Sequence, residues 1–287
     1  MRAVSRVCDV SINTVTKLLV DAGNACAAFH HEKVRNVAAK SVQCDEIWSF
    51  AYTKAANLKH AKAAPVGSGD VWTWTGIDAD TKLIISWHVG DRDHGAAMEF
   101  MSDLRARLAN RVQLTTDGHK AYLSAVNKLD FDADYVMLVK IYGQGTLHTA
   151  QGRYSQPAVI GTQTSVIRGN PDMDKVNTSY AERHNLTMRM QMRRFTRLTN
   201  GFSKKFDNHC YALALYFVWY NWIRLHKALR VTPSMAAGLT DKIMDMRDVI
   251  ALIDAAEPNP KPRAASAGHF FCGGPRRLPS QYEPGLF

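Results

Sequence analysis

The stretch TSYAERHNLTMRMQMRRFTRLTNGFSKKF, residues 178–206, combines a single carboxylate, Glu182, with a long series of cations. Its basic residues are Arg183, Arg189, Arg193, Arg194, Arg197, Lys204 and Lys205. A helix turns about 100° per residue, so Glu182 would lead a row that also holds three of the arginines, at positions 189, 193 and 197. Such a row suits a divalent metal held beside a phosphate backbone, because Mg²⁺ prefers oxygen ligands and phosphates attract fixed positive charge.

The same stretch also allows a purely structural interpretation. Ser179 and Glu182 have the S-x-x-E spacing of a capping box, in which the Glu only satisfies a backbone N–H at the start of a helix. The arginines alone could form a solvated face. A functional role for Glu182 therefore requires further acids elsewhere in the chain.

Composition favours a large folded core and a polyanionic partner. The chain has 287 residues, 46% of them hydrophobic, and carries a net charge of +10 with a pI near 9.4. Nucleic acid is the first candidate partner and an anionic membrane surface the second. The most apolar run, residues 210–223, is too short to span a bilayer and contains Asn221, so we expect no membrane insertion.

Several chemistries have no motif in this sequence. The five cysteines are scattered, without a C-x-x-C pair or zinc-ligand spacing, which favours a reduced, cytoplasmic setting. No charged-then-apolar leader opens the chain, and we expect no signal peptide. No G-x-x-x-x-G-K-[ST] motif occurs, so a nucleotide cofactor is not indicated.

The first 23 residues have the pattern of a helix-turn-helix, whose second helix enters the DNA major groove. A short helix is expected over 1–7, and Ser11 is a good N-cap for a second helix that Gly23 would end. Any small helical hairpin would look similar. In the DNA-binding interpretation Asn13, Thr14 and Lys17 face the groove. Residues 24–40 are expected to form a helical connector.

From residue 41 onward the pattern changes to an α/β fold with a mixed sheet, in the order β-β-β-α-β-α-β followed by helices. The expected strands are 42–52, 71–77, 83–89, 111–116 and 135–141, and the expected helices between them are 95–110 and 120–129. Residues 142–175 are expected to be irregular, a long helix is expected over 202–227, and another should begin at Thr232-Pro233. We therefore divide this part into a core over 41–206, a helical C-terminal part over 207–256 and a disordered tail over 257–287.

Two further acids could join Glu182. Asp45 and Glu46 lie inside the first expected strand, where their side chains should point to opposite faces, so that only one could look into a site. Asp117 follows the fourth strand directly, although it could be only a turn-former or helix N-cap. A right-handed crossover would place the first and fourth strands side by side. Carboxylates from these strands and from a covering helix could then hold two Mg²⁺ ions about 4 Å apart, as in phosphodiester chemistry.

Four motifs carry a resemblance to a known family. They are CDEIWSF (44–50), TTDGHKAY (115–122), YAERHNLTMRMQMRRFTRLTNGFSKK (180–205) and HKALRVTPSMAAGL (226–239). With the segment 1–23, they resemble the DDE transposases of the insertion sequence 1 family, over residues 1–255. The resemblance implies a ribonuclease H-like core in which Asp45, Asp117 and Glu182 are the catalytic, metal-binding triad.

The resemblance also implies the reaction and its partners. Two Mg²⁺ ions, with Mn²⁺ as a substitute, would support cleavage at the ends of an insertion element and strand transfer into target DNA. Pairing two DNA ends implies at least a homodimer, in the cytoplasm and associated with the nucleoid. Family members often carry a cysteine-rich zinc-binding segment before the helix-turn-helix. This sequence has none, so we expect a truncated module.

Supporting residues complete the hypothesis. Arg189, Arg193, Arg197, Lys204 and Lys205 are expected to hold DNA. His119 and His184 could touch a phosphate or serve only as polar residues, and Asn185 could orient Glu182 by a hydrogen bond. Two alternatives stay open: a DNA-binding regulator with an inert core, and a nuclease of the same fold that cuts without joining.

Overall fold

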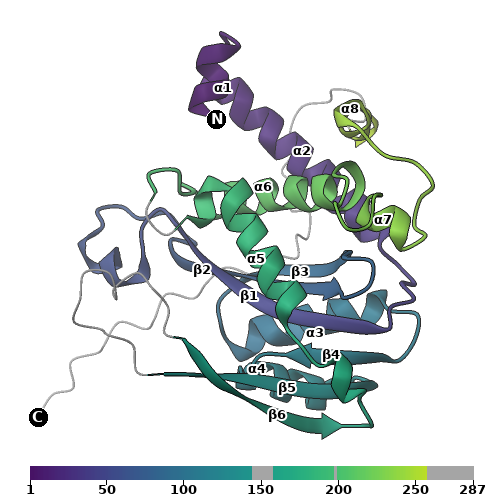
Figure 1. The fold of residues 1–287 in the computed structure, drawn as a ribbon. Coiled ribbons are helices and arrows are strands. Elements are labelled where there is room, and N and C mark those ends of the chain that lie inside the picture. Colours follow the sequence, from purple (N-terminus) through teal and green to yellow (C-terminus); the bar gives the residue numbers. More distant parts are fainter. Residues whose placement is uncertain (144–157, 197–198, 257–287) are drawn as a thin grey trace, which may run out of the picture.

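The computed structural model describes residues 1–143, 158–196 and 199–256, and its centre is a mixed six-stranded sheet (Figure 1). The strands are β1 (Ser41–Ala51), β2 (Gly69–Asp78), β3 (Ile84–Gly90), β4 (Val112–Thr116), β5 (Ala133–Tyr142) and β6 (Val159–Arg168). Their order across the sheet is β3-β2-β1-β4-β5-β6. The β1–β4 and β4–β5 pairs are parallel and the other three are antiparallel. The first and fourth strands therefore lie side by side, as predicted.

Helices cover both faces of this sheet (Figure 1). The longer ones are α2 (Ile12–Lys33), α3 (His94–Arg107), α4 (Lys120–Lys128), α5 (Ser179–Gln191), α6 (Phe206–Val218) and α8 (Met246–Ala256). The shorter ones are α1 (Arg2–Val7), η1 (Ala55–His60), η2 (Met173–Lys175), η3 (Arg193–Phe195), η4 (Trp219–Ile223) and α7 (Pro233–Ala236). On one face Trp74 of β2 packs against Phe100 of α3 and Tyr122 of α4, and on the other Trp87 of β3 stacks on Phe217 of α6. The predicted order β-β-β-α-β-α-β is confirmed, and so is the helix beginning at Thr232-Pro233, where the Thr232 side chain caps α7.

The stretch 142–175, predicted to be irregular, contains strand β6 and the short helix η2. That prediction is wrong for these residues. β6 pairs with most of β5, from Tyr135 opposite Arg168 to Tyr142 opposite Val159. Its side chains are mostly exposed, so the strand follows from pairing with β5 rather than from an apolar pattern in the sequence.

Gly23 does not end a helix, contrary to the prediction. α2 runs through it to Lys33, and residues 34–40 are not helical, so only the first part of the predicted connector is a helix. A Cβ atom on Gly23 would lie 2.4 Å from the Tyr211 Cβ of α6, so the glycine allows the two helices to approach closely. Helix packing therefore explains this residue.

The predicted single row of Glu182 and arginines is also wrong beyond Arg189. α5 ends at Gln191, and Arg193 lies in η3. Arg194 turns inward, where its Nη1 donates to the Ser203 hydroxyl at 2.8 Å and to the Asn208 carbonyl at 3.2 Å. The following helix begins at Phe206 rather than at 202, and α-helical geometry ends at Val218, where η4 begins. Arg197 and the predicted tail 257–287 lie outside the described residues.

A buried glutamine on β1 fixes α5 against the sheet. The Oε1 of Gln43 accepts from the backbone N–H groups of Tyr180 and Ala181 at 2.9 and 3.2 Å, and its Nε2 donates to Asn177 at 2.7 Å. The first N–H groups of a helix have no partner within the helix, so this side chain supplies their acceptor. On the neighbouring strand Gln113 binds the backbone N–H and C=O of Asp172. Together the two glutamines hold the segment that leads into α5.

Replacing Gln43 by Met keeps the shape of the side chain but removes the acceptor. We expect Gln43→Met to lower the free energy of unfolding by roughly 2–4 kcal/mol, since two N–H groups at the start of α5, one of them on buried Ala181, would lose their acceptor. Chemical denaturation measures this, with the exposed strand residue change Gln163→Met as the control. A loss no larger than that of the control would show that α5 is anchored by other contacts.

Candidate functional site

A cavity of about 830 Å³ opens where β4 ends. The last β1–β4 pair joins Cys44 to Thr116, yet β1 continues to Ala51 and β5 to Tyr142. The two longer strands therefore leave a gap between them, and α5 covers part of it. Four acids and four cations line the cavity: Asp45, Glu46, Asp117, Glu182, Arg92, Lys120, Lys140 and Arg189.

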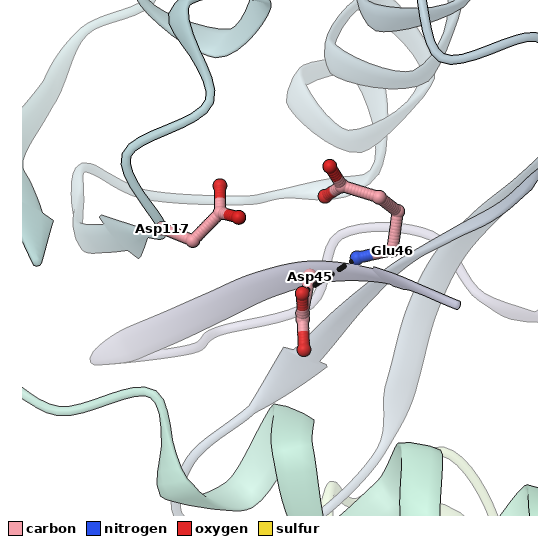
Figure 2. A group of neighbouring side chains, drawn as sticks. All are labelled: Asp45, Glu46 and Asp117. Carbon is pink, nitrogen blue, oxygen red and sulfur yellow. Dashed lines mark hydrogen bonds between the residues drawn. The ribbon is translucent and has the colours of Figure 1, made fainter. Parts of the chain in front are cut away.

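Three of these acids form a tight group. One carboxylate oxygen from each of Asp45, Glu46 and Asp117 lies within 4.8 Å of the others. Figure 2 shows Asp45 and Glu46 leaving β1 in opposite directions, as strand geometry requires, with Asp117 reaching in from the loop after β4. The prediction that only one of the β1 acids could look into the site is nevertheless wrong. Because β4 has ended, the side of β1 is open and both carboxylates reach the same cavity.

Asp45 lies on the α5 side, where its carboxylate is short of neutralising partners. Its Oδ2 accepts from Asn185 Nδ2 at 2.8 Å, and its Oδ1 accepts from the Glu46 backbone N–H at 2.9 Å. Burial, and then the charges of Glu46 and Asp117, raise the pKa of Asp45 to about 7. Asn185 was predicted to orient Glu182. The Asn185 side chain instead donates its hydrogen bond to Asp45, because Asn185 lies on the flank of α5 that faces β1.

Glu46 lies on the α3–α4 side and is well paired. Its carboxylate accepts from Arg92 Nε at 2.6 Å and from the Tyr122 hydroxyl at 2.8 Å. Burial and the nearby Asp117 raise the pKa of Glu46, which these two bonds oppose. The Arg92 guanidinium also lies 3.6 Å from Asp117 and 4.8 Å above the Trp72 ring. Arg92 thus links two of the three clustered acids.

Asp117 forms a turn and also belongs to the acidic group, whereas the N-cap of α4 is His119. The Asp117 Oδ1 accepts from the backbone N–H of His119 at 2.9 Å, which makes Asp117 the turn-former that leads into α4. Its other oxygen stays in the acidic cluster. The turn therefore holds this carboxylate beside β1.

Glu182 lines the cavity but is outside the tight group. Its Oε1 accepts from the Thr178 hydroxyl at 2.7 Å and is ion-paired with Lys140 of β5. The N-cap of α5 is Thr178, and Ser179 is the first helical residue, so the predicted Ser179–Glu182 capping box is wrong. The Glu182 carboxylate is thus directed at the cavity and at a cation instead of the helix backbone.

The two histidines differ in position. His119 lines the cavity, and its Nε2 lies 3.9 Å from the Oε1 of Glu46. Among the described residues this buried nitrogen has no hydrogen-bond partner. Burial and Arg92 lower the pKa of His119. His184 is buried on the opposite flank of α5 and lines a different pocket. Only His119 can therefore reach a molecule bound among the acids.

The predicted DNA-binding residues are scattered over the surface. Arg189 lines the cavity, Arg193 bonds Thr199, and Lys204 lies 3.6 Å above the Phe202 ring. Lys205 is exposed at the start of α6. In the N-terminal part Asn13, Thr14 and Lys17 are exposed, and Lys17 is ion-paired with Asp21 at 2.6 Å. The structure leaves these surfaces accessible, and their DNA binding stays a prediction.

The donors in the cavity suit a hard divalent cation. Carboxylate oxygens are the ligands that Mg²⁺ prefers. Burial, and then the charges of Glu46 and Asp117, raise the pKa of Asp45, and a bound cation would offset both causes. Asp45 and Asp117 are the available ligands, with Glu182 adjacent. Glu46 is already satisfied by Arg92 and Tyr122.

Comparison with known proteins adds no relative, since no protein-family model and no curated protein matches this sequence. Within the described ranges 1–143, 158–196 and 199–256, every helix is too short or too polar to cross a membrane. The geometry of the site is therefore the main basis for a functional inference.

Sequence reasoning missed three members of this site. Glu46 was left out of it, Arg92 was not considered, and Lys140 was seen only as part of a strand. The sequence did hold one signal, two adjacent acids within an apolar strand, since both must find partners when buried. The two cations had no comparable signal, because their pairing with Glu46 and Glu182 joins residues more than 40 positions apart.

The raised pKa of Asp45 predicts how stability depends on pH. The folded protein holds this proton more tightly than the unfolded chain does. The contribution of Asp45 to stability is therefore complete below about pH 4 and is lost as the pH rises through about 7. Without metal, the free energy of unfolding of Asp45→Asn should therefore rise relative to that of wild type as the pH increases from 4.5 to 8, by roughly 1–4 kcal/mol. Denaturation in EDTA at several pH values measures this, and a constant difference across the window would contradict it.

Proposed function

We propose that this chain is a DDE transposase of the insertion sequence 1 family, with a ribonuclease H-like catalytic core. One observation carries the proposal. Asp45 and Asp117, from adjacent parallel strands, place carboxylate oxygens within 4.8 Å in a cavity that Glu182 also lines. The strand order and the helix α5 across the acidic strand support the same core.

In this proposal Asp45, Asp117 and Glu182 hold two Mg²⁺ ions, with Mn²⁺ as a substitute. The ions would activate the attacking oxygen and stabilise the leaving one. Thr178 and Lys140 both bind the Oε1 of Glu182, so a metal would compete with Lys140 for this oxygen or use Oε2. Glu46 keeps Arg92 beside Asp117, so that the guanidinium can bind a phosphate at the mouth of the cavity.

Two reactions would use this cavity in turn. Water would attack a phosphorus at the end of the element and break its bond to the 3′-oxygen, which leaves a 3′-hydroxyl and a 5′-phosphate. That 3′-hydroxyl would then attack a phosphorus of the target DNA and displace the 3′-oxygen of the neighbouring target nucleotide, which leaves as a hydroxyl. Both are in-line displacements, so one arrangement of carboxylates serves both. The unpartnered Nε2 of His119 is placed to contact a phosphate oxygen of DNA that lies beside Glu46.

The cations outside the cavity would hold the DNA. Arg189 stands at its edge, and Lys204 and Lys205 lie at the start of α6. The segment of α1 and the first turns of α2 would act as a helix-turn-helix through Asn13, Thr14 and Lys17. Bringing two element ends together requires at least a dimer, which would act in the cytoplasm on nucleoid DNA.

Cleavage of DNA taken from both sides of the coding sequence tests the proposal. We expect Mg²⁺-dependent nicking by wild type and a loss of at least about a hundredfold for Asp45→Asn, Asp117→Asn and Glu182→Gln, because each removes a metal ligand. Labelled ends resolved on a denaturing gel measure the cut, and joined products measure strand transfer.

The control is Asp254→Asn, an exposed aspartate on α8 that should leave cleavage unchanged. Cutting without joined products would favour the nuclease alternative. Sequence-specific binding with no cleavage at any Mg²⁺ or Mn²⁺ concentration would favour the regulator.

The salt dependence of DNA binding tests the proposed phosphate contacts. Replacing both Lys204 and Lys205 by Ala should reduce the slope of log Kobs against log salt by about 1.8, because each phosphate contact contributes about 0.9. Fluorescence anisotropy between 50 and 200 mM salt, a range suited to such contacts, measures the slope. The matched control is Lys33→Ala with Lys175→Ala. Each of these lysines is ion-paired with an acid at 2.7 Å, Lys33 with Glu32 and Lys175 with Asp172. An unchanged slope would remove Lys204 and Lys205 from the interface.

A further inference from the structure

A second pocket, of about 290 Å³, lies on the other flank of α5 from the acidic cavity. α5 forms a wall of both: Glu182, Asn185 and Arg189 line the first, whereas Arg183, His184 and Thr187 line the second. The remaining walls come from the β2–β3 turn, which carries Lys82, and from the chain after η4, which carries Arg224, His226 and Lys227. Nothing in the proposed strand chemistry uses this pocket.

The charge of this pocket has one sign. Lys82, Arg183, Arg224 and Lys227 line it, and no acid does. Within the part of the chain that the structure describes, none of these four cations has an ion-pair partner. Lys82 and Arg224 lie over aromatic rings instead, those of Tyr180 and Tyr220, at 3.2 and 5.7 Å. A concave surface with uncompensated charge concentrates ions of the opposite sign.

The floor of the pocket holds a polar group that lacks a partner. His184 is 2% exposed, and neither of its ring nitrogens has a hydrogen-bond partner among the residues that the structure describes. Its ring packs among aromatic rings, 4.6 Å from that of Tyr220 and 6.1 Å from that of Phe217. Buried polar groups are almost always hydrogen-bonded, so an unpartnered imidazole that lines a pocket points to a missing ligand.

The protonation of this imidazole defines what it can offer. Burial, and then the Arg224 charge, lower the pKa of His184 to about 3. The ring is therefore neutral near pH 7 and has one N–H group to donate. Burial, and then the charges of Arg224 and Lys82, lower the pKa of His226.

We propose that this pocket binds a phosphate group, held by the four cations and by the N–H group of His184. Guanidinium groups form paired hydrogen bonds to phosphate oxygens, and the two lysines add charge at the rim. The phosphate can belong to a nucleic-acid backbone or to a free phosphoryl compound, and the chemistry of recognition is the same. The site is separate from the acidic cavity and needs neither its carboxylates nor a metal.

Two probes in EDTA distinguish the sources. Pyrophosphate binding is measured by calorimetry, and binding of a 20-nucleotide DNA strand is measured by anisotropy. The pocket variant is Arg183→Gln with Lys227→Gln, two exposed residues. The charge-matched control is Lys33→Gln with Lys175→Gln, which do not line the pocket. For at least one probe we expect the pocket variant to bind about tenfold more weakly than the control, because it loses charge-assisted bonds.

The outcomes are distinct. Weaker pyrophosphate binding assigns the pocket to free phosphoryl groups, and an effect on DNA alone assigns it to the backbone. Equal binding by the pocket variant and the control, for both probes, overturns the proposal. Thermal unfolding curves without ligand that match those of wild type confirm that the variants fold. If the pocket variant does not fold, the test is repeated with Arg224→Lys, which keeps the charge but loses the guanidinium fork. Both probes are used without metal, whereas the transposase proposal is tested by Mg²⁺-dependent cleavage, so failure of this proposal and failure of the transposase proposal give different results.

Discussion

The hydrogen bonds of the Gln43 amide determine where the second half of the site lies. This side chain is two residues before Asp45 on the same strand, and it accepts the first free N–H groups of α5. The helix start is therefore held at a fixed place on β1, and Glu182 and Asn185 follow within the next two turns. Without that anchor, the register between the helix and the acidic strand would depend on the single Asn185–Asp45 hydrogen bond and on apolar contacts, which are less directional than hydrogen bonds.

Unequal strand lengths create the space in which the acids meet. β4 stops at Thr116, so the longer neighbours β1 and β5 face each other across a gap lined by side chains from both faces of the sheet. Charge is balanced around most of this gap. Arg92 neutralises Glu46 and approaches Asp117, and Lys140 neutralises Glu182. Asp45 is the exception among the described residues, since its side-chain partner is a neutral amide, and its pKa is the one raised to about 7.

The sequence predicted the parts of this fold that depend on local pattern. The order of elements along the chain follows from apolar runs and turn signals. The adjacency of β1 and β4, and with it the approach of Asp45 to Asp117, follows from a right-handed crossover. The sequence was misleading where tertiary contacts override local signals. Gly23 looked like a helix stop but is a point of close packing against Tyr211, and β6 is held by pairing with β5.

The position of Glu46 was missed for a different reason. Alternation along a strand was applied as though the strand were paired on both sides, whereas β1 is open beyond Cys44 on its β4 side. The arginine row failed because α5 ends at Gln191 and the half-buried Arg194 bonds inward soon after it. Neither the length of a neighbouring strand nor the burial of one arginine can be derived from residue spacing.

The uninterrupted course of α2 has a mechanical consequence. Its 22 residues form a rod of about 33 Å, since each residue rises about 1.5 Å, and its middle is pressed against α6 at Gly23. The amino-terminal turns extend beyond that contact (Figure 1). Because the helix is continuous, it fixes both the distance and the orientation of its amino-terminal end relative to the sheet. Any molecule bound at that end is therefore held at a set angle to the rest of the protein.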